Sequence, residues 1–116
     1  MSKKRIVFDF DGVIHKYSKG WQDGSIYDEP VDGIKEVIDY LRQTYEVVIV
    51  SSRSTQLKGR EAMQEWLNKY NIVVDQILAG KPPAMIYIDD RGYKFDGTKL
   101  HSLIWDIEHF KTWQEE

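Results

Sequence analysis

Three short apolar runs, each followed at once by polar residues, constrain what this chain can fold into. The runs are Ile6-Val7-Phe8, Val47-Val48-Ile49-Val50 and Met85-Ile86-Tyr87-Ile88. Their lengths and their apolar content predict strands, and the uninterrupted β-branched run at 47–50 is typical of a strand that is buried on both faces. Ile77-Leu78 is a further, shorter candidate strand.

Amphipathic segments separate and follow these runs. Apolar residues recur at helical spacing over residues 34–41, 62–70 and 100–110. Strands that alternate with helices are typical of α/β domains, so we expect a three-layer domain with a mainly parallel sheet and helices on both faces. Trp66, Trp105 and Trp113 fall on or near the helical stripes, and we expect them in or at the core.

The size and composition of the chain exclude several classes of protein. A length of 116 residues suits one domain over 1–116. The absence of Cys excludes disulfides, thiolate metal sites and cysteine nucleophiles. A net charge of −3 argues against a protein that coats nucleic acid through bulk charge. No apolar run approaches the roughly 18 residues of a membrane span and no segment resembles a secretory signal, so we expect a cytoplasmic protein.

Polar groups gather where the predicted strands end. The three segments are Asp9-Phe10-Asp11-Gly12, Ser51-Ser52-Arg53-Ser54 and Asp89-Asp90-Arg91-Gly92. Because ligands of open parallel sheets bind outside the carboxyl ends of the strands, we expect these segments to form one site. Asp9 and Asp11 are two residues apart and point to one side of an extended backbone. Carboxylates this close repel unless a cation lies between them, and together with Asp89 and Asp90 they predict a Mg²⁺ site.

The same residues resemble the motifs of a known family. Val7–Ile14 is similar to the first motif of haloacid dehalogenase-like (HAD) phosphohydrolases, and Val48–Arg53 to the second. Lys81-Pro82 resembles the third motif and Ile88–Asp90 the fourth, and all four occur in the family's order. The stretch that leads from Lys81 to Arg91 is similar to a small branch without a cap domain that is frequent in phage and prophage genomes.

The resemblance implies a role for each motif residue. Asp9 would be the nucleophile that forms an aspartyl-phosphate, and Asp11 the general acid and base. Ser51 would donate a hydrogen bond to a phosphoryl oxygen, helped by the backbone N–H groups of Ser52 and Arg53. Asp9, the backbone carbonyl of Asp11 and Asp89 would hold Mg²⁺, with Asp90 behind them.

Lys81 would be the family's phosphate-binding lysine, but only seven residues separate it from Asp89. If all were extended, at about 3.3 Å per residue, the two would lie roughly 26 Å apart at opposite ends of the sheet. Lys81 therefore reaches the site only if the Pro82-Pro83-Ala84 segment turns the chain back. The alternative is a surface lysine, with Arg53 or Arg91 as the replacement cation.

Residues 12–29 form a long irregular segment that is too short for a cap domain. One interpretation is a flap over the site, in which Gly12 gives backbone freedom while Lys16 and Trp21 contact an anionic substrate. The other interpretation is a hairpin with solvated lysines. His15 lies in this segment, and we expect at most an accessory role for it.

Together these features predict a Mg²⁺-dependent phosphatase without a cap domain, which acts on a phosphomonoester through an aspartyl-phosphate. The substrate could be a small metabolite, a nucleotide or a nucleic-acid end, and the oligomeric state stays open. A phosphotransferase would use the same intermediate. The alternative class is a catalytically silent phosphate-binding or regulatory module on the same fold. A response-regulator receiver is disfavoured, because Ser51 stands where a receiver carries its acceptor aspartate.

Overall fold

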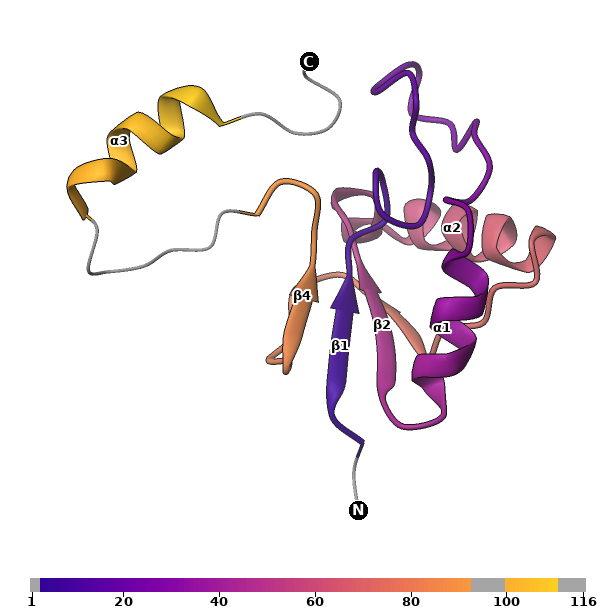
Figure 1. The fold of residues 1–116 in the computed structure, drawn as a ribbon. Coiled ribbons are helices and arrows are strands. Elements are labelled where there is room, and N and C mark those ends of the chain that lie inside the picture. Colours follow the sequence, from indigo (N-terminus) through magenta and orange to yellow (C-terminus); the bar gives the residue numbers. More distant parts are fainter. Residues whose placement is uncertain (1–2, 93–99, 111–116) are drawn as a thin grey trace.

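The sheet has four parallel strands. The structure is a computed structural model that describes residues 3–92 and 100–110. Strands β1 (Arg5–Phe8), β2 (Glu46–Val50), β3 (Gln76–Leu78) and β4 (Ile86–Ile88) pair in the order β3-β2-β1-β4 (Figure 1). The predicted α/β class and its parallel sheet are confirmed.

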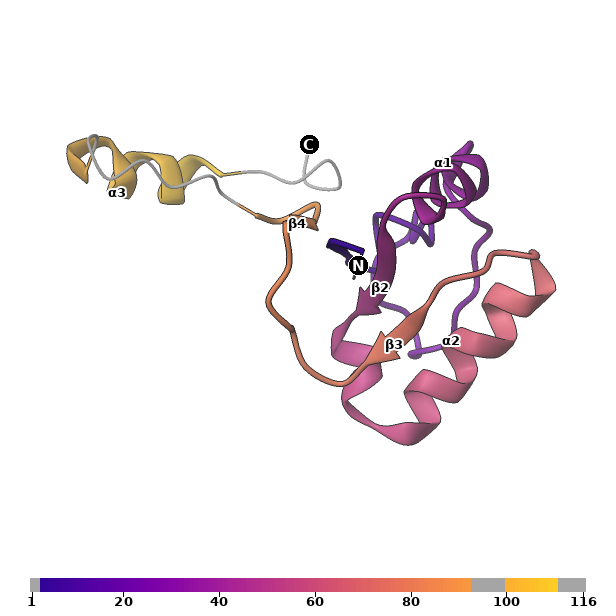
Figure 2. The ribbon, with the colours of Figure 1, turned by 90° about the horizontal axis from the view of Figure 1, so that it is seen from below.

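The order of the strands decides which face each connection covers. Helix α1 (Ile34–Arg42) joins β1 to β2, and the 3₁₀ helix η1 (Ser52–Thr55) with helix α2 (Leu57–Lys69) joins β2 to β3. Each connection leads to the next strand on the same side, from β1 to β2 and from β2 to β3. Because both crossovers are right-handed, α1 and α2 lie on the same face of the sheet (Figure 2). Residues 79–85 run back to β4 across the opposite face. Helix α3 (Leu100–His109) lies on that side, beyond β4 (Figures 1 and 2).

The core lies between the sheet and the first two helices. Its side chains come from alternate positions of β1 and β2, from α1, from one stripe of α2, and from the segments that follow β1 and α2: Ile6, Phe8, Val47, Ile49, Ile38, Met63, Trp66, Leu67, Phe10, Ile14 and Ile72. Val7 and Val48 point to the opposite face and are buried as well. Burial on both faces explains why these two strands are apolar after their first residues, Arg5 and Glu46.

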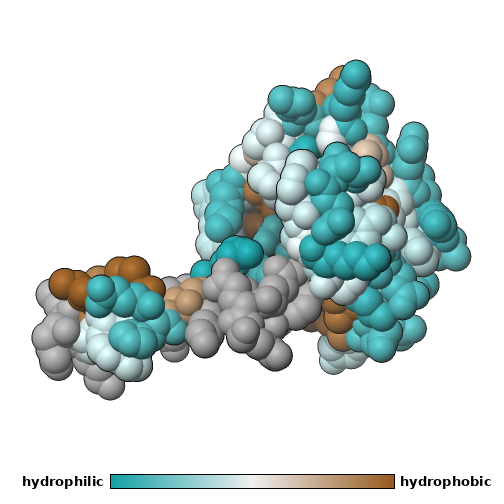
Figure 3. Space-filling model, turned by 90° about the horizontal axis from the view of Figure 1, so that it is seen from above, coloured by the Kyte–Doolittle hydropathy of each residue, from teal (hydrophilic) through white to brown (hydrophobic). Residues whose placement is uncertain are grey.

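The expectation for the tryptophans is right for one residue and wrong for another. Trp66 is buried, whereas the side chain of Trp105 on α3 is 61% exposed, and Trp113 lies outside the described residues. Ile104 and Ile107 on α3 are also exposed, and the apolar side chains of this helix stand out in a view from the carboxyl ends of the strands (Figure 3). An amphipathic stripe specifies a helix, but it does not specify what the helix packs against.

Residues 12–29 fold back on themselves above the carboxyl ends of the strands (Figure 1). The N–H of Lys16 donates to the carbonyl of Glu29 at 3.0 Å, and Ser18 Oγ donates to Asp28 at 2.6 Å. The hydroxyl of Tyr27 closes the tip of the loop, because it accepts from the N–H of Lys19 and donates to the carbonyl of Gly20. We call this internally bonded segment the flap. Neither the flap nor residues 54–80, which hold α2 and β3, contain a cap domain.

Among the described residues, no helix is both long enough and apolar enough to cross a membrane.

Candidate phosphate and metal site

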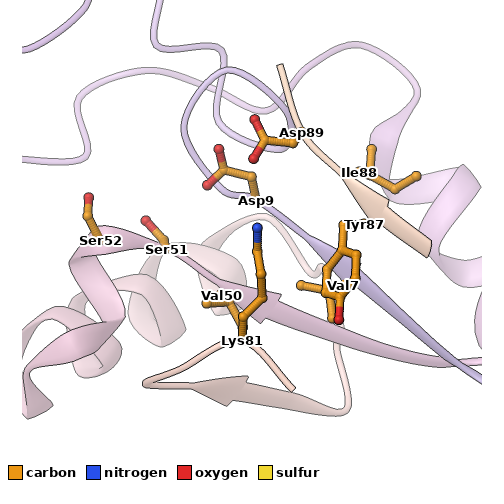
Figure 4. Close-up of a pocket in the computed structure, with 9 residues that line it drawn as sticks. All are labelled: Val7, Asp9, Val50, Ser51, Ser52, Lys81, Tyr87, Ile88 and Asp89. Atoms are coloured by element: carbon orange, nitrogen blue, oxygen red, sulfur yellow. The ribbon is translucent and has the colours of Figure 1, made fainter. Parts of the chain in front are cut away.

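The candidate site lies at the point in the sheet where the chain reverses the direction in which it adds strands. The chain leaves β1 toward β2 and later reaches β4 on the other side of β1, which makes the carboxyl ends of β1 and β4 the expected ligand crevice. Asp9 follows β1, Ser51 follows β2, and Asp89 follows β4. With Lys81, these residues line a hollow of about 200 Å³ (Figure 4). The segments that the sequence predicted to meet do lie together.

Three carboxylates converge at this edge. One oxygen from each of Asp9, Asp89 and Asp90 lies within 4.8 Å of the other two. The pKa of Asp9 is raised to about 6, chiefly because burial removes water from its carboxylate, and the charges of Asp89 and Asp90 raise it further. The N–H of Phe10 donates to Asp9 Oδ1 at 2.8 Å and partly offsets these effects. A cation placed among these oxygens would relieve the repulsion.

Asp11 is held differently from Asp9, although both line a second hollow beside the first. Its Oδ1 accepts a hydrogen bond from His15 Nδ1 at 2.8 Å, and its Oδ2 accepts from Arg53 Nε at 2.8 Å. Burial raises the pKa of Asp11, but the bonds from His15 and Arg53 outweigh it, so the pKa is lower than usual. Its two bonds orient the carboxylate of Asp11, which is not one of the three carboxylates that converge at Asp9, Asp89 and Asp90.

His15 contributes more to the site than the sequence indicated. Its side chain is fully buried, and its Nε2 accepts from the N–H of Asp28 at 3.0 Å. Nε2 therefore carries no proton, and Nδ1 is the atom that donates to Asp11. The sequence signal was the Asp-Gly turn: Gly12 has φ 83°, and its N–H donates to the carbonyl of His15 at 2.8 Å, which brings residues 11 and 15 together.

The segment after β2 is built around Ser51. Ser51 is buried, and its Oγ accepts from the N–H of Arg53 at 3.2 Å. Ser54 Oγ lies 2.7 Å from the carbonyl oxygens of both Ser51 and Leu78, which share its single hydrogen, and this tie links the segment to the end of β3. The N–H of Arg53, expected as a phosphate donor, is thus engaged with Ser51. The exposed side chain of Ser52 lines the first two hollows together with Asp9.

Arg53 connects the flap to the site. Besides its bond to Asp11, its Nη1 donates to the carbonyl of Gly24 in the flap. Its side chain is only 12% exposed. The sequence offered its guanidinium as an alternative to Lys81 for binding phosphate, and in the structure Nε and Nη1 bond to Asp11 and to the flap.

The chain makes the reversal that Lys81 needs to reach the site. The hydroxyl of Tyr87 in β4 donates to the carbonyl of Pro82 at 2.6 Å, so the segment before β4 runs beside β4. The N–H of Met85 donates to the carbonyl of Arg5, at the start of β1. The chain therefore runs from Lys81 toward the amino ends of the strands, turns near Met85, and returns toward the carboxyl ends as β4. Lys81 Nζ lies 5.1 Å from the centre of the Tyr87 ring, and its amino group points toward Asp9 (Figure 4).

Three residues that the sequence predicted to take part in substrate binding lie away from the hollows that contain Asp9 or are engaged within the flap. Lys16 Nζ pairs with Glu29 at 2.7 Å and lines neither of the two hollows that contain Asp9. Trp21 is 70% exposed and lines another hollow, which also includes Ser52. The N–H of Gly12 is used within its own turn.

Comparisons with known proteins give a fold and no family. No protein-family model matches the chain, and no curated protein matches it. A chain of the Pnkp1/Rnl/Hen1 complex matches with a TM-score of 0.54 and 21% identity over 98% of this chain and 37% of its own length. A chain of the Pnkp1/Rnl/Hen1 RNA repair complex matches with a TM-score of 0.52 and 18% identity over 94% and 33%, respectively. This chain thus spans about a third of each matched chain, and the likeness shows a shared fold.

Proposed function

We propose that this protein is a Mg²⁺-dependent phosphomonoester hydrolase of the HAD type, with Asp9 as its nucleophile. The observation that carries the proposal is the meeting of Asp9, Ser51, Lys81 and Asp89 around one hollow at the carboxyl edge of the sheet. A nucleophilic carboxylate, a hydroxyl donor, a cation and a metal-binding acid are the groups that phosphoryl transfer to a protein side chain requires.

The reaction would proceed in two steps. A carboxylate oxygen of Asp9 attacks phosphorus, the bond from phosphorus to the leaving oxygen breaks, and that oxygen takes up a proton from protonated Asp11. Water then attacks the phosphorus of the aspartyl-phosphate, gives a proton to Asp11, and releases phosphate and free Asp9. The lowered pKa of Asp11 favours its unprotonated form, which is the form that accepts a proton in the second step, whereas the first step uses the protonated form. Ser51 and Lys81 would hold the phosphoryl oxygens.

The carboxylates fit a divalent cation. Asp9, Asp89 and Asp90 offer hard oxygen ligands within reach of one another, and the charges of Asp89 and Asp90 add to the effect of burial in raising the pKa of Asp9. The family resemblance adds the backbone carbonyl of Asp11. Bound there, Mg²⁺ would neutralise negative charge on the transferring group.

The substrate would be a phosphorylated metabolite, a nucleotide or a nucleic-acid end. The two structural neighbours come from an RNA repair complex, which supports including nucleic-acid ends among the candidates. A silent phosphate-binding module would use the same hollow without turnover.

A phosphatase screen with Mg²⁺ tests the proposal. Nucleotides, sugar phosphates, and oligonucleotides phosphorylated at either end are offered to the parent and to Asp9→Asn. We expect turnover by the parent and a loss of more than about 10³-fold in the variant, because an amide is a poor nucleophile. Circular dichroism checks that the variant is folded. Phosphate binding without any turnover by the parent would favour the silent module, and full activity of Asp9→Asn would rule out the covalent mechanism.

A further inference from the structure

A hollow of about 350 Å³ lies beside the proposed phosphate pocket, between the flap and α2. Trp21 and Ile26 of the flap line one side of it, and Lys58 and Ala62 of α2 line the other. Ser52 lines both this hollow and the pocket that contains Asp9 and Lys81. A molecule with its phosphate at Asp9 therefore has an adjoining space for the group that carries the phosphate.

The indole of Trp21 is held in place at the edge of this space. Its ring lies over Gly24, where a Cβ atom would come within 3.0 Å of the ring carbon Cη2. Gly24 has φ +88°, a conformation that favours glycine, and its carbonyl accepts from Arg53. The flap thus positions a large aromatic surface that is still 70% exposed.

The wall formed by α2 complements this surface. Lys58 and Ala62 are four residues apart on the helix, so they lie on the same side of it. Ala62 contributes only a small side chain to this wall, and Lys58 adds a cation to the lining of the hollow. A planar aromatic ring attached to an anionic group matches an aromatic face with a nearby cation.

We propose that the hollow between Trp21 and α2 binds the base of a phosphorylated nucleotide, with the base stacked on Trp21 and the phosphate at Asp9. The inference rests on the proposed function, which leaves the substrate class open. A sugar phosphate has no planar aromatic group and would use the phosphate pocket alone. The nucleotide can be a free mononucleotide or the end of a nucleic acid, because both present a base beside a phosphate.

Binding to the full chain with Asp9→Asn and Mg²⁺ tests the inference without turnover. The ligands are adenosine monophosphate, an oligonucleotide phosphorylated at one end, and glycerol phosphate as a ligand without a base. Trp21→Ala, Trp21→Phe and Trp105→Ala are compared in calorimetric titrations. Trp105 is the matched control, since it is also a largely exposed tryptophan but lies on α3.

We expect Trp21→Ala to weaken binding of the adenosine ligands by roughly tenfold, within the range measured for one stacked base, and Trp21→Phe to retain most of the affinity. Glycerol phosphate should bind all variants alike, and Trp105→Ala should change nothing. A larger loss for the oligonucleotide than for the mononucleotide would identify a nucleic-acid end as the source of the base. Unchanged nucleotide binding in Trp21→Ala, or an equal loss for glycerol phosphate, would overturn the inference.

Measuring turnover by the parent protein, in which Asp9 is unchanged, separates this inference from the proposed function. If the parent hydrolyses phosphomonoesters but Trp21→Ala weakens nucleotide binding no more than glycerol phosphate binding, the base site is wrong and the proposed function stands. If nucleotides bind in a manner that depends on Trp21 and nothing is hydrolysed, the base site stands and the enzymatic function is wrong.

Discussion

Gly59 on α2 lies directly against the backbone of Arg53. A Cβ atom at position 59 would come 1.7 Å from the carbonyl oxygen of Arg53, a distance that no packing adjustment of side chains can relieve. The close approach fixes α2 against η1, and η1 carries the guanidinium that binds both Asp11 and the flap. A glycine outside every motif thus helps to position the candidate site.

Gly59→Ala should therefore destabilise the protein by about 1–3 kcal/mol, the usual cost of forcing extra volume into a packed contact. Gly80→Ala is the matched control, because nothing lies within 4 Å of a Cβ atom there. Thermal denaturation measures both. Equal melting temperatures for the two variants would contradict the close approach of α2 and η1.

The raised pKa of Asp9 predicts how stability depends on pH when no metal is present. A carboxyl group whose folded-state pKa is raised from 3.8 to about 6 favours the protonated form in the folded protein. Its contribution to stability is therefore full below about pH 4 and is lost as the pH rises to about 6. Above that, the charge destabilises the fold by about 1–2 kcal/mol, after allowance for the partial exposure of Asp9.

Asp9→Asn should accordingly melt higher than the parent at pH 8 in the presence of a chelator, and at the same temperature as the parent at pH 4. Excess Mg²⁺ should remove the advantage of the variant at pH 8. Glu65→Gln, on the exposed surface of α2, controls for the loss of a carboxylate. The same difference in melting temperature between the parent and Asp9→Asn at both pH values would show that the buried charge of Asp9 does not destabilise the fold.

Asp89 and Asp90 should differ in their effect on Mg²⁺ binding. Asp89 lines the hollow that contains Ser51 and Lys81, whereas Asp90 lines the neighbouring one. We expect Asp89→Asn to weaken Mg²⁺ binding at least about tenfold more than Asp90→Asn does, because Asp89 lines the hollow proposed for the phosphoryl group, where the family resemblance places the metal. Calorimetric titration measures both, with Asp32→Asn as a control at a side chain that is 97% exposed. The reverse order would exchange the roles of the two acids.

His15 should act on the reaction through its bond to Asp11. His15→Asn can keep a donor near the position of Nδ1, whereas His15→Leu fills the space among Phe10, Tyr27 and Trp66 without a donor. We expect His15→Leu to lower kcat by about 10–100-fold, a part of what general acid–base catalysis contributes, and His15→Asn to lower it less. If both variants lose the same activity and the same thermal stability, His15 serves packing alone.

Much of the fold could be predicted from the sequence because strands and helices leave local patterns. The apolar run at 47–50 became β2, and the acids and serines after β1, β2 and β4 met at one edge, since parallel strands share the side on which they end. The stripe that contains Trp105 predicted α3 correctly as a helix, but it wrongly placed that tryptophan in the core.

What the sequence determined by itself was the set of elements and the residues that follow each strand, because these depend on neighbours along the chain. The tertiary structure decided which partner each charged group takes, because partners come from segments far apart in the sequence. Arg53 bonds to Asp11, 42 residues away, and to Gly24 in the flap. Lys81 reaches the site only because the chain reverses before β4. A hydrogen bond tolerates changes of only a few tenths of an ångström in the distance between donor and acceptor, and the packing of the sheet, the flap and α2 sets that distance.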